Sequence, residues 1–501
     1  MDSLLLLLHG FETALTWTNL MYCFIGVSIG MIIGVLPGLG PVSGAALLIP
    51  FTFGMEPVTA IIMIAGIFYG SMYGGAITSI LINTPGEAAS IITCIDGYPL
   101  TKQGRAGVAL GVSAIGSFIG GIVAVVSLTL IGPILANYAL KFGPSEMFSI
   151  MMLGLLMVVA LIGKSLIKGL IAAVLGLILS LIGMDQVSGA VRFTFGRMEL
   201  LDGLDFIIIA MGMFGIAEIL TNAEQQMKME KVAKIDGLMP KRDEWIPTFK
   251  SIGRGTGVGM FLGLIPGANS VIASLLSYSM EKKIAKDPSR FGKGAIEGVA
   301  GPETANNAHS GAALIPLFTL GIPSSPAVAV ILGALVIHGL NPGPALFTNN
   351  PDFIWGVIAS MFIGNILLLI MNLPLVGLWA KVALVPYKLM YPLVLLLVMI
   401  GTYAASNSLW GVGMCMFFGV IGYAMKKLDI PIAATVLTFI LGQQIEATLL
   451  QSLTITENGG WIFFTRPISG VIMGISLFIL ILSIYSSIKN KRSVLASDLE
   501  S

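Results

Sequence analysis

Two Pro-Gly pairs interrupt apolar stretches of this chain, and each lies at the centre of a similar motif. The first motif is GVLPGLGP at residues 34–41, and the second is GLIPGANS at residues 263–270. Proline and glycine end helices and so free backbone N–H and C=O groups. In hydrocarbon each freed group costs several kcal/mol unless protein or water satisfies it. Helix breaks at matching places in two halves of a membrane protein are typical of a transporter's binding site.

The composition is that of a membrane protein. Of 501 residues, 56% are hydrophobic and 11% are charged, whereas about 25% are charged in a soluble domain. The net charge is +1, and the chain has no basic run of the kind that binds nucleic acid. Its three cysteines, Cys23, Cys94 and Cys415, lack the spacing of a metal or redox centre. We predict an all-α polytopic membrane protein surrounded by the lipid bilayer, with no nucleic-acid partner and no cofactor.

A helix needs about 20 apolar residues to cross the hydrocarbon of a bilayer. Nine stretches are candidates for such spans: 106–131, 146–162, 165–182, 206–221, 353–372, 391–405, 409–424, 431–450 and 468–488. A long polar insert then divides the chain. We predict a first transmembrane repeat at 1–221, a cytoplasmic linker at 222–254, a second transmembrane repeat at 255–488 and a cytoplasmic tail at 489–501.

Three features recur in the same order in the two halves. The matching pairs are GMIIGVLPGLG (30–40) with GMFLGLIPGAN (259–269), GGAITSILINTPG (74–86) with SGAALIPLFTLGIPS (310–324), and IDGYP (95–99) with IHGLNPG (337–343). A general likeness among glycine-rich and proline-rich membrane helices is the alternative. The shared order favours an internal repeat.

The placement of basic residues predicts the orientation of each copy. Lysines and arginines flank both ends of the second Pro-Gly segment, 255–280, whereas none precedes Lys102 in the first half. Because cytoplasmic loops carry the excess of Lys and Arg, the second segment is predicted to be a re-entrant hairpin that opens to the cytoplasm. The first opens to the outside, which gives an inverted-topology repeat with broken helices. The alternative is one tilted span with a proline kink in each half.

The residue types at the breaks suit an anion. Half-helix N-termini carry about half a positive charge and attract carboxylates. Glycines let a ligand approach the backbone, and Ser43 is expected to cap the helix that follows the first break. Neutral Asn, Thr and Ser groups bind a carboxylate or, through their oxygens, a sodium ion. The predicted substrate-binding residues are Gly38, Gly40, Ser43, Asn83, Thr84, Pro85, Gly86, Gly267, Asn269, Ser270, Ser324 and Ser325.

A polar stripe with one carboxylate follows the basic flank of the second hairpin, in GPETANNAHSG at 301–311. Pro302 suits the first turn of a helix, and Glu303, Asn306, Asn307 and Ser310 then share one face. An acid at membrane depth is costly and therefore typical of a functional site; the alternative is an ordinary loop. Glu87, in the first turn after Pro85-Gly86, either caps a helix or binds a cation. The predicted cation-coupling residues are Glu303, Asn306, Asn307 and Glu87, with sodium as the one metal ion considered.

The other ionisable residues in apolar sequence are assigned to span ends or to local hydrogen bonds. They include Asp96, Glu218, Glu446 and the three histidines. The sequence shows no grouping of Ser, His and Asp, and no metal-ligand spacing, that would support an intramembrane hydrolase. We therefore predict that the protein is not an enzyme.

Taken together, the motifs resemble those of the large membrane subunit of the tripartite tricarboxylate transporter family, over about residues 15–485. The resemblance is carried by GVLPGLGP, GGAITSILINTPGEAAS (74–90), IPGANS, the PE-x-ANNA pattern at 302–308 and LGIPSSPAVAV (320–330). The chain has Gly301 where that family usually has Ala.

The resemblance implies a subunit of the bacterial inner membrane. It implies two protein partners, a small four-span membrane subunit and a periplasmic solute-binding protein, and import of citrate or another carboxylate driven by an ion gradient. Asn, Thr and Ser oxygens suit sodium whereas Glu303 suits a proton, so the coupling ion stays open between Na⁺ and H⁺. A stand-alone organic-anion permease or an anion channel is the alternative function.

Overall fold

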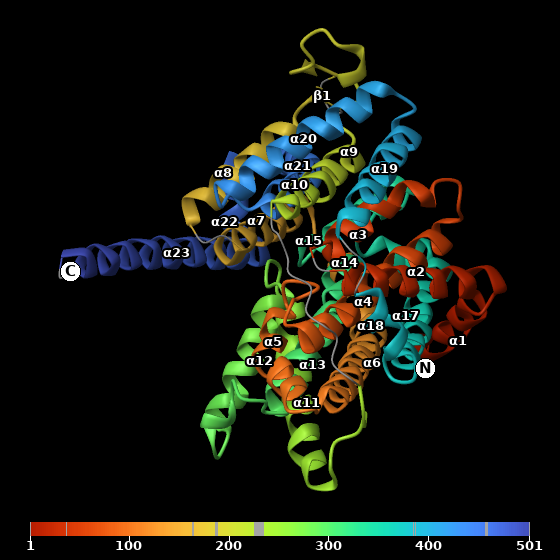
Figure 1. Cartoon of the computed structure of the whole chain (residues 1–501). Helices are drawn as coiled ribbons and strands as arrows, with labels where there is room; N and C mark the ends of the chain where they lie inside the picture. Colours follow the sequence, from red (N-terminus) through yellow and green to blue (C-terminus); the bar gives the residue numbers. More distant parts are fainter. Residues whose placement is uncertain are drawn as a thin grey trace.

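The computed structural model describes residues 2–36, 38–162, 165–185, 189–224, 235–383, 385, 387–455 and 459–499. Over these residues the chain is almost entirely helical (Figure 1), apart from a short antiparallel hairpin of β1 (Gly183–Met184) and β2 (Val191–Arg192). Nine of the described helices are long and apolar enough to cross a membrane. The prediction of an all-α polytopic membrane protein is confirmed.

One group of helices, the hairpin bundle, contains both Pro-Gly breaks and fills the lower and right part of Figure 1. Its helices from the first half are α1 (Asp2–Ala14), α2 (Trp17–Val35), α3 (Gly40–Leu48), α4 (Pro57–Ile82), α5 (Ile91–Lys102) and α6 (Ala106–Ala139). Its helices from the second half are α11 (Trp245–Gly263), α12 (Ser270–Ile284), α13 (Glu297–Ala312), α14 (Leu314–Leu320), α15 (Pro326–Ile337), α16 (Ala345–Asn349), α17 (Pro351–Asn372) and α18 (Val376–Val382).

A second group, the flanking bundle, packs beside α3 and α15 and occupies the upper and left part of Figure 1. It consists of α7 (Pro144–Ile162), α8 (Leu166–Ser180), α9 (Phe206–Ala210), the π-helix η3 (Met211–Ile216), α10 (Ala217–Ala223), α19 (Tyr387–Ser406), α20 (Leu409–Lys427), α21 (Ile432–Ile455), α22 (Ile462–Thr465) and α23 (Pro467–Leu499). Short 3₁₀ turns connect several elements: η1 (Ile49–Thr52), η2 (Met198–Leu200), η4 (Arg242–Glu244), η5 (Pro288–Arg290) and η6 (Gly459–Trp461). Each bundle therefore draws helices from both halves of the sequence.

Most predicted spans correspond to long helices, with two differences. The stretch 165–182 forms α8, whose 15 residues extend about 22 Å at 1.5 Å per residue and so fall short of a hydrocarbon core about 30 Å thick. The apolar part of α19 is likewise short, at 390–406. Conversely, α2 and α4 are full-length spans although each ends at a break.

Two helix pairs of the hairpin bundle pack through glycines spaced four residues apart. On α2, a Cβ added to Gly26, Gly30 or Gly34 would lie 2.2–2.5 Å from carbonyl oxygens of α4, those of Met63, Ile67 and Ser71. On α11, a Cβ at Gly255, Gly259 or Gly263 would lie 2.3–2.7 Å from carbonyl oxygens of α13, those of Gly301, Ala305 and His309. Small residues allow this close approach of backbones in a membrane. The recurrence of one contact pattern supports two copies of a single structural unit.

Helix α11 begins at Trp245, within the segment predicted as a linker. The helix is amphipathic there: Thr248 and Ser251 are buried, whereas Lys250 is exposed and Arg254 pairs with Glu281 of α12 through two bonds of 2.6 and 2.7 Å. The sequence prediction placed residues 245–254 in the linker because of their charged residues, which lie on one face of the helix. Residues 225–234 of the predicted linker lie outside the described residues.

Asp96 of α5 ties the first half to the second. Its buried carboxylate accepts the backbone N–H groups of Gly292, Gly294 and Ala295 at 2.7–2.9 Å, and the hydroxyl of Tyr278 at 2.9 Å. Hydrogen bonds of this number satisfy a carboxylate without a cation. Asp96 is hydrogen-bonded, as expected, but its partners are not local: they lie 182–199 residues further along the chain, so the clamp spans the two halves.

Replacing Gly259 by Ala should destabilise the protein, because the new methyl group would meet the Ala305 carbonyl oxygen at 2.3 Å. Overpacking of this kind costs about 1–3 kcal/mol. The matched control is Gly257→Ala on the same helix, where nothing lies within 4 Å of the added Cβ. We expect a lower melting temperature in detergent for G259A and an unchanged or higher one for G257A. Equal melting temperatures would contradict the close packing of α11 on α13.

The opposite orientation of the two hairpins is a prediction that labelling tests. Glu56 and Lys282 are both exposed, and they flank the first and the second hairpin. In a C94A background, where Cys23 and Cys415 are buried, E56C should react with an impermeant thiol reagent added outside intact cells. K282C should react only after the cytoplasmic face is opened. Reaction of both cysteines from one side would contradict the inverted arrangement.

Candidate functional site

A cavity of about 370 Å³ lies where the hairpin bundle meets the flanking bundle; we call it the junction cavity. Its lining comes from residues 38–43 at the start of α3, Met72 of α4, residues 85–88 and Ile91 around the start of α5, Phe214 of η3, Glu218 of α10, residues 269–271 at the start of α12, and residues 325–327 at the start of α15. Segments far apart in the sequence thus share one wall. The volume is that of a small-molecule site.

At the first Pro-Gly break, α2 ends at Val35 and α3 begins at Gly40. Gly38 has φ +87°, a conformation that strains residues with a Cβ, and its carbonyl accepts the side-chain amide of Asn222 at 3.0 Å. Pro37 lies outside the described residues. The expectation that Ser43 caps α3 is wrong: Ser43 lies inside the helix, and its hydroxyl donates to the Phe214 carbonyl at 3.0 Å. The side chain joins the two bundles instead.

The second Pro-Gly break has the same backbone form. Gly267 has φ +82°, and its N–H donates to the Ser324 carbonyl at 2.9 Å. Asn269 caps α12, because its side-chain oxygen accepts the Ile272 N–H at 3.0 Å. Asn269 and Ser270 line the junction cavity, whereas Gly267 packs against α7 outside it.

The two downstream breaks also match each other. Asn83 ends α4 and Gly321 ends α14, both in the left-handed conformation. After Asn83 the chain turns so that Pro85, Gly86 and Glu87 reach the cavity. Gly86 passes so close to α2 that an added Cβ would lie 1.8 Å from the Gly34 carbonyl oxygen. No larger residue fits that contact without moving a helix.

Not every predicted residue reaches the cavity. Of the substrate-binding set, Gly38, Gly40, Ser43, Pro85, Gly86, Asn269, Ser270 and Ser325 line it. Asn83 is exposed away from it, and the Thr84 hydroxyl donates to the Ile82 carbonyl at 3.1 Å. Ser324 is buried, with its hydroxyl 3.3 Å from the Ala313 carbonyl, while its neighbour Ser325 caps α15.

Three half-helix N-termini therefore converge on one cavity, those of α3, α12 and α15, and the start of α5 lies beside them. Each N-terminus exposes unpaired N–H groups and the positive end of a helix dipole. Within the described lining, the ionisable side chains are Glu87 and Glu218, with no Lys, Arg or His. The positive potential of this cavity comes from the backbone, and its fixed charges are negative.

Behind this wall is a buried acid cluster, formed by Glu87, Thr93, Glu303 and Asn306. Glu303 of α13 accepts a hydrogen bond from the Thr93 hydroxyl through Oε1, and the Asn306 amide donates to Glu87 Oε1 at 2.7 Å. Among the described residues, Glu303 Oε2 and Asn306 Oδ1 have no hydrogen-bond partner, although both are buried. Neither carboxyl group forms an ion pair within the described ranges. An ionised carboxylate that is buried without an ion-pair partner is strongly unfavourable.

The polar stripe differs in detail from the sequence expectation. Pro302 does not open the helix, because α13 begins at Glu297 and contains Pro302 in its interior. All faces of α13 are buried, so its polar residues have separate partners. Asn307 donates to the Ser117 hydroxyl at 2.8 Å on α6, and Ser310 donates to the Asn306 carbonyl at 2.9 Å. Asn307 thus lies beside the acid cluster as a packing contact between helices.

The two copies contribute different residues to the acid cluster. The glycine contacts pair Met63, Ile67 and Ser71 of α4 with Gly301, Ala305 and His309 of α13. In that register the counterparts of Glu303, Asn306 and Asn307 are Ala65, Phe68 and Tyr69. The repeat therefore shares its backbone geometry, while the cluster joins Glu87 and Thr93 of the first half to Glu303 and Asn306 of the second, and Glu303 has no acidic counterpart on α4.

Sequence reasoning missed several residues of the site. Glu218 was assigned to a span end or a local hydrogen bond; it accepts such a bond from Asn222, but it also lines the cavity and pairs with Lys426 of α20. Asn222 donates to both Glu218, at 3.1 Å, and Gly38. Buried His309 lies with Nε2 2.5 Å from the Ala268 carbonyl, next to the second break. The sequence signal for Glu218 and Asn222 was an acid and an amide one helical turn apart, at the start of the polar insert.

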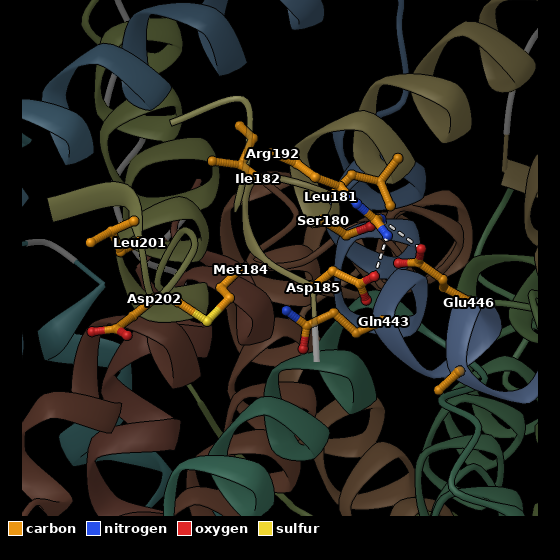
Figure 2. Close-up of a pocket in the computed structure, with 11 residues that line it drawn as sticks. Ser180, Leu181, Ile182, Met184, Asp185, Arg192, Leu201, Asp202, Gln443 and Glu446 are labelled. Carbon is orange, nitrogen blue, oxygen red and sulfur yellow. Dashed lines mark hydrogen bonds and ion pairs between the residues drawn. The ribbon is translucent and has the colours of Figure 1, made fainter. Parts of the chain in front are cut away.

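A second cavity, of about 260 Å³, lies at the β1–β2 hairpin and α21 (Figure 2). Figure 2 shows its guanidinium, that of Arg192, between Asp185 and Glu446, at 2.6 Å from each. The positive charge is already balanced by two carboxylates. No residue predicted from the helix breaks lines this cavity, so we place the functional site at the junction cavity.

Comparison with known proteins gives matches over most of the chain. A family model described as the tripartite tricarboxylate transporter TctA family matches residues 20–437. A protein of Agrobacterium vitis, described as an uncharacterized 52.8 kDa protein in the TAR-I ttuC' 3' region, is 43% identical over 493 residues, 98% of each chain. Another A. vitis protein, described as an uncharacterized protein in the TAR-II ttuC' 3' region, is 43% identical over 234 residues, 47% of this chain and 97% of its own. No solved structure matches significantly.

Proposed function

Since the chain belongs to the tripartite tricarboxylate transporter TctA family, we propose that this large subunit imports tricarboxylates or related carboxylates by ion-coupled secondary transport. In this proposal a periplasmic solute-binding protein delivers the substrate, and a small four-span membrane subunit completes the permease in a bacterial inner membrane. Transport moves the substrate without covalent chemistry.

The observation that carries the proposal is the convergence of the N-termini of α3, α12 and α15 on one cavity. A polycarboxylate presents several negative groups, and several helix N-termini meet them without any one strong ion pair. Gly40, where nothing lies within 4 Å of an added Cβ, leaves the backbone open to the ligand, and Ser270 and Ser325 add hydroxyl groups. This arrangement favours carboxylate binding that is firm enough for capture and weak enough for release.

The fixed negative charges of the site support coupling to a cation. Glu87 lines the junction cavity and accepts a hydrogen bond from Asn306, one turn from Glu303. An anionic substrate is repelled by an ionised Glu87, so a cation or a proton in the acid cluster favours substrate binding. The unpartnered Glu303 Oε2 and Asn306 Oδ1 are oxygen ligands of the kind that a sodium ion takes, and Glu303 is equally a proton acceptor. Either ion links its own gradient to carboxylate uptake.

Uptake by reconstituted vesicles tests the proposal directly. The chain is reconstituted with its small subunit, and labelled citrate is supplied with or without the solute-binding protein under an imposed sodium or proton gradient. We expect accumulation only with the binding protein and with one of the gradients. Equilibrating flux that needs neither would instead identify an anion channel or a stand-alone permease.

Glu303→Gln should abolish the ion dependence, because the amide keeps the hydrogen bond with Thr93 but carries no charge and no transferable proton. We expect gradient-driven citrate uptake to fall at least about tenfold, a loss of ~1.4 kcal/mol in coupling. The control is E297Q on the same helix, whose carboxylate pairs with Arg290 at the surface.

The same variants identify the ion. If the cluster binds sodium, NaCl should raise the melting temperature of the purified wild-type protein above that in choline chloride, and E303Q should lose the increase. If it carries a proton, melting is insensitive to sodium and uptake follows the pH gradient. Ion-coupled uptake by E303Q at the wild-type rate would contradict a role for the acid cluster.

A further inference from the structure

One ion pair borders the junction cavity. Glu218 lines the cavity and pairs through Oε2 with Nζ of Lys426, in the last turn of α20. The other ion pairs of the described residues contain no cavity-lining residue. Lys426 is thus the cation bound to the cavity wall in the part of the chain that the structure describes.

We propose that Lys426 is a substrate-binding residue: Glu218 holds its ammonium group while the cavity is empty, and a substrate carboxylate takes the place of Glu218 when the cavity fills. The inference rests on the proposed function, since it needs an anionic substrate in the junction cavity. It adds a positively charged side chain to a site whose described lining has none.

The pair is built for exchange rather than for rigidity. The Lys426 and Glu218 side chains are 30% and 22% exposed, so the contact is open to water and to a ligand. The pair of Arg254 and Glu281 differs in geometry: the guanidinium binds both oxygens of a carboxylate that is only 2% exposed, although the Arg254 side chain itself is 36% exposed. Lysine carries a compact charge on a flexible four-carbon stem, which lets it change partners.

Exchange leaves neither charge stranded. Lys426 trades one carboxylate for another of the same kind, so the ion pair is kept. Glu218 retains the hydrogen bond from Asn222 at 3.1 Å, and its exposure allows water to replace the ammonium group. Because the internal carboxylate competes with the substrate, binding is moderate and release is fast, as conduction through a membrane site requires.

Competition between Glu218 and the substrate predicts opposite changes in citrate affinity when either residue of the ion pair is replaced. Glu218→Gln removes the competing charge and should tighten citrate binding by a few fold. Lys426→Gln removes the cation and should weaken citrate binding at least about tenfold, with a smaller loss for succinate, which has one carboxylate fewer. The double variant should bind citrate more weakly than E218Q, because the cation is lost, and at least as tightly as K426Q, because an unpaired carboxylate is removed from the cavity wall.

The adjacent residue supplies a matched control. Lys427 pairs with Glu224, at 52% and 44% exposure, and neither residue lines the cavity. K427Q and E224Q remove the same kinds of charge from a neighbouring ion pair outside the cavity, so citrate affinity should stay at the wild-type value in both.

The experiment measures citrate and succinate binding to the purified full-length chain by calorimetry, with melting temperatures to confirm folding. If K426Q does not fold, K426R retains the charge and should keep citrate affinity within a few fold, while E218Q still tests the opposite sign. Equal weakening by E218Q and K426Q, with recovery in the double variant, would show a structural ion pair and overturn this inference alone. A wild-type chain that binds no carboxylate overturns the proposed function and this inference together.

Discussion

Backbone N–H groups at membrane depth are the constraint on which the rest of the structure depends. Ending a helix inside hydrocarbon is costly unless the freed groups face protein, water or a ligand. Here the N-termini of α3, α12 and α15 face one cavity. The backbone just before these helices is shaped by Gly38 and Gly267, which have positive φ, and by the capping residues Asn269 and Ser325. The glycine contacts of α2 and α11 allow these segments to lie close enough to share that cavity.

The two copies of the repeat contribute similar backbone features but different side chains. Both provide a break, a left-handed helix end and a half-helix N-terminus, so the positive side of the site is nearly symmetric. The acidic and polar residues are not distributed symmetrically. Glu303 and Asn306 of the second copy face Glu87, whereas the matching positions of α4 are Ala65 and Phe68. The acid cluster therefore links the two halves through Glu87 and Glu303, and it breaks the symmetry of the duplicated backbone.

The sequence was sufficient for features that follow from local rules. Pro-Gly pairs and the residues after them predicted the breaks. Eight of twelve proposed substrate residues line one cavity, because residues at the start of a half-helix stay close to the break that precedes it. Features set by distant contacts were not predictable. Glu218 needed the position of Lys426, 208 residues later, to become part of the site. Pro302 was placed at a helix start by local preference, but packing of α13 on α11 and α6 extends the helix back to Glu297.

The Asp96 clamp has a consequence for how the chain is made. The first of its backbone donors in the sequence, the N–H of Gly292, lies 196 residues after Asp96. At a synthesis rate of about 5–20 residues per second, roughly 10–40 s pass between the synthesis of Asp96 and that of Gly292. During that time Asp96 has none of its four partners. The final packing of α5, which carries Asp96 in its middle, therefore depends on contacts that only the second half of the chain supplies, from α12 and the loop that follows it.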